Sequence, residues 1–99
     1  DRIVATSTWV PRRHTAVPDS PAVQLRGMAT MTTHQGRGIG ARLVEVGCER
    51  ARTNGAALVW ANARDAALAF YRRNGFTVIG EGFVDEATRL PHHLVMRDL

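Results

Sequence analysis

The chain has 99 residues, 44% of them hydrophobic and 22% charged, which predicts one soluble globular domain over residues 1–99. The formal net charge is +4, and the basic residues are all arginines, scattered along the chain without an aromatic stripe, which argues against a nucleic-acid partner. A single cysteine, Cys48, excludes an intrachain disulfide and fits a cytoplasmic protein. No apolar run approaches the ~20 residues that span a bilayer, so no membrane partner is expected.

A hairpin with a long loop is predicted first. Residues 3–10 are rich in β-branched side chains and predict a strand that Pro11 ends. Residues 12–21 predict an exposed loop. Residues 23–31 predict a second strand, in which Gly27 indicates a bulge.

The second half alternates between helices and strands. Apolar residues at three- and four-residue steps predict a helix over 39–53, with Cys48 in its core face and Asn54-Gly55 at its end. Further elements are a buried strand over 56–61, a helix over 66–73 with Asp65 as N-cap, a strand from 76 towards 84 and a closing strand over 92–97. This order predicts an α/β (α+β) fold with a mixed, mostly antiparallel sheet, in which parallel strands flank the first crossover.

The glycine-rich turn before the first helix is the principal candidate site. Gly36, Gly38 and Gly40 leave the backbone N–H groups accessible at a helix N-terminus, where the helix dipole favours an anion. Arg37 adds positive charge. The turn therefore predicts a phosphate or pyrophosphate site.

Two nucleotide-binding alternatives can be weighed at this turn. Gly36, Gly38 and Ala41 also satisfy the G-x-G-x-x-A dinucleotide pattern, with Asp65 downstream to bind a ribose. A nucleotide-triphosphate loop is excluded because the chain contains no lysine. No metal site is expected.

Two motifs at matching separation resemble one known family. Gln35-Gly36-Arg37-Gly38-Ile39-Gly40 is similar to the Q/R-x-x-G-x-G/A signature of the GCN5-related N-acetyltransferases, and residues 62–76 resemble their A-x-x-F-Y-x-x-x-G-F segment. The resemblance covers residue 3 to the end and implies an acyl-CoA N-acyltransferase-like fold with a splayed parallel strand pair. It also implies that the family's first strand, two helices and second strand are absent.

The resemblance implies acetyl-CoA as cofactor and a primary amine of a small molecule or peptide as acceptor. The backbone of Met28 and Thr30 would bind pantetheine, and the N–H groups of residues 35–40 would bind the pyrophosphate. Tyr71 would be the acid that protonates the departing thiolate. The full implied cofactor contact set is Met28, Ala29, Thr30, Gln35, Gly36, Arg37, Gly38, Ile39, Gly40, Ala41, Asn62, Ala67, Phe70 and Tyr71.

The sequence leaves the general base and the acceptor open. The second strand has Gln24 and Arg26 where relatives often carry a glutamate, and the remaining candidates are Glu81, Asp85, Glu86, His92 and His93. Both histidines are expected on the surface. A homodimer that covers the first strand's edge is predicted, and a non-catalytic acyl-CoA-binding module is the alternative function.

Overall fold

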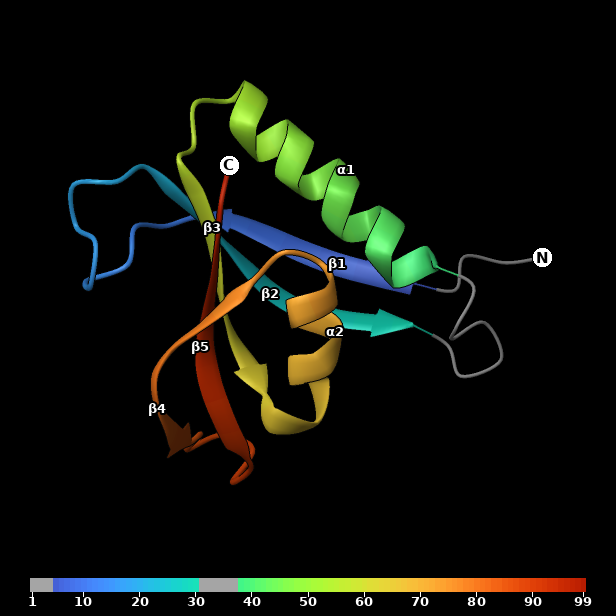
Figure 1. Cartoon of the computed structure of the whole chain (residues 1–99), viewed down its shortest axis with the longest axis vertical. Helices are drawn as coiled ribbons and strands as arrows, with labels where there is room; N and C mark the ends of the chain where they lie inside the picture. The colour runs from blue at the N-terminus through green and yellow to red at the C-terminus, as the bar shows by residue number, and fades with distance from the viewer. Residues whose placement is uncertain (1–4, 31–37) are drawn as a thin grey trace.

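The protein folds around one five-stranded sheet with two helices (Figure 1). The computed structural model describes residues 5–30 and 38–99. The strand order is β1-β2-β3-β5-β4. In chain order the elements are β1 (Ala5–Pro11), β2 (Ala22–Thr30), α1 (Ile39–Thr53), β3 (Leu58–Arg64), the 3₁₀ turn η2 (Asp65–Ala67), α2 (Leu68–Arg73), β4 (Thr77–Val84) and β5 (Pro91–Asp98). The predicted fold class and element order are confirmed.

Strands β1 and β2 form the predicted antiparallel hairpin. The register shifts between Ser7 and Thr8, where Gly27 has no partner and a φ of 56°, so the predicted bulge is confirmed. The first strand was predicted to end at Val10, before Pro11. It ends one residue later, because Pro11 still pairs with Val23. Pro11 is tolerated there because β1 has no described neighbour on its other side to receive an N–H group.

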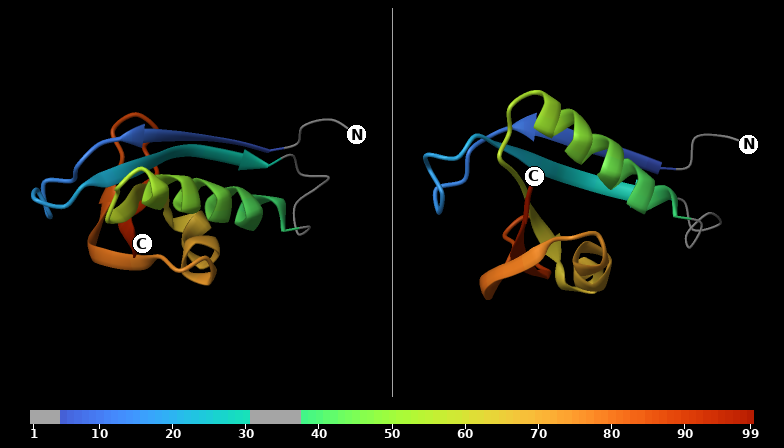
Figure 2. Two further views of the ribbon diagram at one scale, coloured as in Figure 1. Left: turned by 90° about the horizontal axis from the view of Figure 1, so that it is seen from above. Right: turned by 45° about the horizontal axis from the view of Figure 1, so that its top comes forward.

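Strands β2 and β3 are parallel and then diverge. They pair only over Ala22–Gln24 and Leu58–Trp60, although β2 has 9 residues and β3 has 7. Beyond Gln24 the two strands part, and Figures 1 and 2 show β2 and β3 running in different directions from that point. The splayed parallel pair implied by the sequence is therefore present.

Both helices lie on one face of the sheet (Figure 2). The main core lies between them and the strands and contains Leu25, Val44, Cys48, Ala51, Val59, Ala61, Ala63, Tyr71, Phe76 and Val95. Burial of Cys48 confirms that it is a core residue. No helix among residues 5–30 and 38–99 combines the length and the apolar character that crossing a membrane requires.

The second helix begins later than predicted. Residues 65–67 form a 3₁₀ turn and the α-helix starts at Leu68. The prediction of Asp65 as a side-chain N-cap was wrong, because its carboxylate bonds to His93 instead. The predicted stop at Asn74-Gly75 is confirmed, since Gly75 has a φ of 89° and Phe76 N–H bonds to the Tyr71 carbonyl at 3.0 Å.

Candidate functional site

The N-terminus of α1 has the features of an anion site. Gly38 precedes the helix with a left-handed φ of 75°, and the first helical bond runs from Arg42 N–H to the Gly38 carbonyl at 3.0 Å. The N–H groups of Ile39, Gly40 and Ala41 therefore have no partner inside the helix. No acidic residue occupies the first turn. This end of α1 is positive, and among the described residues its N-cap Gly38 supplies no side-chain cap, which suits a phosphate group.

The diverging end of β2 supplies a second row of backbone groups. Ser7, Thr6 and Ala5 of β1 pair with Met28, Ala29 and Thr30 along one edge of β2. On the other edge, pairing with β3 has already stopped at Gln24. Backbone groups that point to this second edge therefore face the gap between the diverging strands, as the pantetheine assignment requires. The predicted contacts at Gln35, Gly36 and Arg37 lie outside the described residues.

Tyr71 is packed within the main core of the protein. Its side chain is 8% exposed, and its ring contacts Phe70 and Phe76 edge to face, at centroid distances of 5.5 and 5.2 Å. Tyr71 is itself a core residue, and Phe70 and Ala67 are half-buried and pack against the same core. Burial raises the pKa of Tyr71, so its hydroxyl stays protonated at neutral pH.

Asn62 lies on the opposite face of the sheet from Tyr71. Ala61 and Ala63 belong to the helix-side core, whereas Trp60 packs in a second cluster on the other face. Since side chains alternate along a strand, exposed Asn62 shares the face of Trp60. The structure therefore brings Ala67, Phe70 and Tyr71 together but not the side chain of Asn62.

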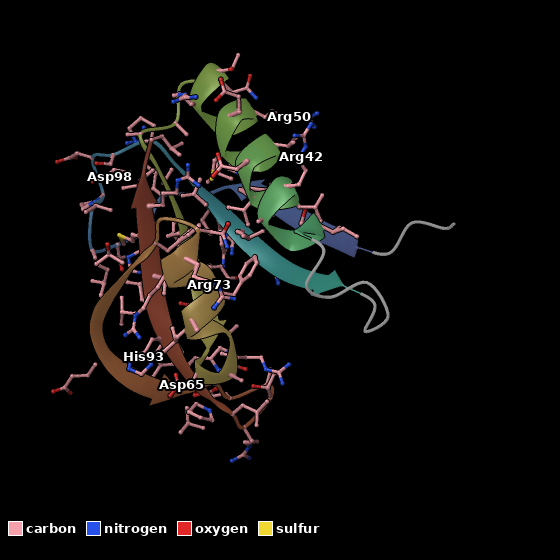
Figure 3. The ribbon with its side chains drawn as sticks, turned by 45° about the vertical axis from the view of Figure 1, so that its right-hand side comes forward. Arg42, Arg50, Asp65, Arg73, His93 and Asp98 are labelled. Atoms are coloured by element: carbon pink, nitrogen blue, oxygen red, sulfur yellow. The ribbon has the colours of Figure 1, made fainter. Side chains whose placement is uncertain are left out.

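The two histidines of β5 were expected on the surface, but His92 is buried and His93 is half-buried. His92 is 6% exposed, is stacked on Phe83, and holds its Nδ1 at 2.8 Å from the Leu90 carbonyl. His93 is half-buried with its Nδ1 2.6 Å from Asp65 Oδ1 (Figure 3). A Cβ added at Gly82 would lie 2.7 Å from the His93 ring, so glycine is required for this close packing.

Sequence reasoning missed a polar cluster that joins the β1–β2 loop to the sheet. Arg12 Nη1 donates to Gln24 Oε1 at 3.0 Å, and Trp60 Nε1 donates to the Arg12 carbonyl at 2.8 Å. Arg12 and Gln24 are 12 positions apart in the chain, and Arg12 and Trp60 are 48 apart, so no local motif predicts these contacts. Among the described residues, no group of three His, Cys, Asp or Glu side chains could bind a metal.

Comparison with known proteins identifies the architecture. The model of the acetyltransferase (GNAT) family matches residues 1–76. YitI of Bacillus subtilis (strain 168), an uncharacterized N-acetyltransferase, is 26% identical over 94 residues, which cover 95% of this chain and 62% of YitI.

Solved structures show the same fold. An acetyltransferase of the GNAT family from Staphylococcus aureus Mu50 superposes with a TM-score of 0.76 and 21% identity, covering 98% of this chain and 60% of that protein. A Bacillus subtilis acetyltransferase in complex with CoA gives a TM-score of 0.74 and 18% identity, covering 100% of this chain and 71% of that protein. The chain thus spans 62% of YitI and 60% of the Staphylococcus protein. With the family model matching residues 1–76, the chain belongs to the acetyltransferase (GNAT) family.

Proposed function

We propose that this chain binds acetyl-CoA and transfers its acetyl group to a primary amine. One observation carries the proposal: α1, whose N-terminus has no side-chain cap from Gly38, is the next described element after β2, a strand that parts from its parallel neighbour β3 beyond Gln24. A linear cofactor with a diphosphate needs both features, an anion site for the diphosphate and unpaired strand backbone for its amide arm. The family supports the same assignment.

The residues present fit such a cofactor. In this assignment the N–H groups of Gly38, Ile39 and Gly40 hold the diphosphate, together with those of the turn before them. No carboxylate in the first turn of α1 opposes the negative charge. The backbone of Met28 and Thr30 binds the pantetheine arm, with β3 on the other side of the gap.

Bound acetyl-CoA supplies an activated thioester carbonyl. The amine nitrogen forms a bond to that carbonyl carbon and gives up a proton to water, the carbon–sulfur bond breaks, and the thiolate takes up a proton. We assign the proton to Tyr71, whose burial keeps the phenol protonated and whose packing between Phe70 and Phe76 fixes its ring.

The test combines calorimetric binding of CoA with thiol release from acetyl-CoA in the presence of a panel of primary amines. Tyr71→Phe should lower kcat at least ~100-fold, because a general acid typically contributes 10²–10⁴-fold, and should leave the Kd for CoA nearly unchanged. The phenylalanine keeps the buried ring, so the melting temperature reports whether packing is intact.

Two results would contradict this proposal. Unchanged turnover in Tyr71→Phe would remove the acid assignment. CoA binding without turnover of any amine would favour the alternative, a non-catalytic acyl-CoA-binding module.

A further inference from the structure

The face of the sheet opposite the helices carries the guanidinium of Arg12 at the point where β2 and β3 diverge. Arg12 N–H bonds to the Ala22 carbonyl at 3.0 Å, and the Arg12 carbonyl accepts from Trp60 Nε1. Its Nη1 bonds to Gln24, which is 8% exposed and stands in the last parallel pair, opposite Trp60. The backbone of Arg12 is thus bonded to the sheet at two points, and its exposed side chain is held by one hydrogen bond to Gln24.

Most of the donor capacity of Arg12 is still available. A guanidinium has five N–H donors in a planar fork, and one of its nitrogens contacts Gln24. The Arg12 side chain makes no other hydrogen bond or ion pair with the described residues. Among the same hydrogen bonds, none uses the amide nitrogen of Gln24, so this buried side chain also has a donor left over.

Positive charge continues from Arg12 along the diverging strands. Arg26 follows Gln24 by two residues on β2, and Arg64 ends β3 on the face of Trp60. Both are exposed, and neither belongs to an ion pair between described residues. The sequences of β1, β2 and β3 contain no aspartate or glutamate.

In the proposed reaction this face is the side from which the amine arrives. The helices and the α1 anion site lie on the other face, and Tyr71 packs there. A cofactor that enters from the helix side leaves the opposite opening of the gap for the acceptor. Arg12 in the β1–β2 loop and Gln24 and Arg26 on β2 border that opening.

We propose, on the basis of the proposed function, that the acceptor is an amine that also carries an anionic group, a carboxylate or a phosphate, which Arg12 binds with support from Arg26 and Arg64. The fork of a guanidinium matches either anion in a two-pronged contact. The absence of acidic residues on these three strands means that a purely cationic polyamine has no counter-charge there.

The experiment compares matched amines by thiol release. The carboxylate pair is 4-aminobutyrate and 4-aminobutanamide, whose amines are far enough from the variable group to titrate similarly. The phosphate pair is phosphoethanolamine and ethanolamine. We expect kcat/KM to be at least ~10-fold higher for the anionic member of one pair, and that pair identifies whether the anion is a carboxylate or a phosphate.

Single-residue variants then show which arginines cause the preference for the anionic amine. Arg12→Gln and Arg26→Gln should each lower kcat/KM for the preferred anionic amine by ~10-fold, leaving its uncharged partner and the Kd for CoA within 2-fold. Arg50→Gln is the matched control, because it removes the same charge from an exposed site on α1, across the sheet (Figure 3). In the control the preference should persist.

The outcomes separate this inference from the proposed function. Equal rates for both members of each pair, or equal losses in Arg50→Gln and Arg12→Gln, would overturn the anionic acceptor while acetyl transfer stands. If no amine turns over, calorimetric binding of the anionic amines to the CoA-loaded chain decides: binding lost in Arg12→Gln supports the site, and no binding overturns it.

Discussion

A glycine flanks each end of α1, but the two ends differ in whether their free N–H or C=O groups find hydrogen-bond partners. Gly38 at the start and Gly55 at the end both have left-handed backbones, with φ of 75° and 91°, and a Cβ at either would meet nothing within 4 Å. At the C-terminal end, Gly55 N–H bonds to the Arg52 carbonyl and Ala56 N–H to the Ala51 carbonyl, both at 3.0 Å. That pattern closes the helix with its own backbone.

The N-terminal end is left open by comparison. Its N-cap Gly38 has no side chain to cap it and no acid occupies its first turn, so three N–H groups have no partner within the helix. Cationic Arg50 and Arg52 in the last turn suit the negative end of the helix dipole, while the positive end has no matching charge. The C-terminal end of α1 satisfies its groups with its own backbone, whereas the N-terminal end leaves three donors for the proposed diphosphate.

The largest expected effect comes from placing the same side chain at both glycines. Gly38→Glu puts a carboxylate on the anion site and should weaken CoA binding at least ~100-fold, because like charges repel and the N–H groups gain an internal partner. Gly55→Glu introduces the same left-handed strain, about 1–2 kcal/mol, at the closed end. Its Kd for CoA should stay within 2-fold in isothermal calorimetry.

The pair is informative because both variants should lose similar stability in urea titrations. A loss of CoA binding in Gly55→Glu as large as in Gly38→Glu would mean that strain, and not the anion site, controls affinity. Tight CoA binding by Gly38→Glu would remove the diphosphate assignment altogether.

The middle of α1 is packed tightly against the sheet at Gly47, and this packing fixes the position of the helix N-terminus. A Cβ at Gly47 would overlap the indole of Trp9, whose Nε1 is fixed by Ser7 Oγ at 2.8 Å. Gly47→Ala should therefore destabilise the fold by about 1–3 kcal/mol, although alanine normally favours a helix over glycine. Chemical unfolding measures the change, and a gain in stability would contradict the packing.

The double variant Trp9→Leu/Gly47→Ala provides the control. If the clash with the indole causes the loss, the alanine should cost less in the Trp9→Leu background than alone. Equal costs in both backgrounds would place the cause elsewhere.

Local sequence signals predicted the elements but not every contact that orients them. Helix α1 was predicted with its observed bounds because its apolar spacing and Asn54-Gly55 are local signals. The bulge at Gly27 and the parallel crossover also follow from local residues and element order. The glycine-rich turn likewise predicted an anion site from local residues, and that site stays a proposal.

Contacts between distant segments had no such signal. Asp65 has the residue type of an N-cap, but His93, 28 residues later, bonds its carboxylate. The Arg12, Gln24 and Trp60 cluster depends on how the β1–β2 loop folds back over the sheet, which residue spacing cannot reveal. Burial of His92 by Phe83 depends on strand register in the same way.

The smallest expected effect concerns the ion pair that ties α1 to the other half of the sheet. Arg97 on β5 contacts Glu45 of α1 at 2.8 Å and the Asn74 carbonyl at the end of α2 at 3.1 Å. The hydrogen bond from Arg97, followed by its charge, lowers the pKa of Glu45. Since the folded-state pKa is lowered, the stabilisation is complete above the carboxyl's ordinary pKa and is lost as pH falls through the lowered value.

Glu45→Gln should therefore cost about 0.5 kcal/mol at pH 7, a small figure because Glu45 is largely exposed and solvent screens the pair. The difference in melting temperature between wild type and Glu45→Gln should shrink as pH falls below 4. Glu49→Gln is a comparison on the same helix, since its partner Arg52 lies on α1 itself and cannot tie the helix to the sheet. If both variants changed stability equally, the Arg97–Glu45 ion pair would contribute no more than the pair within α1. Apolar packing alone would then hold α1, and with it the helix N-terminus, in position against the sheet.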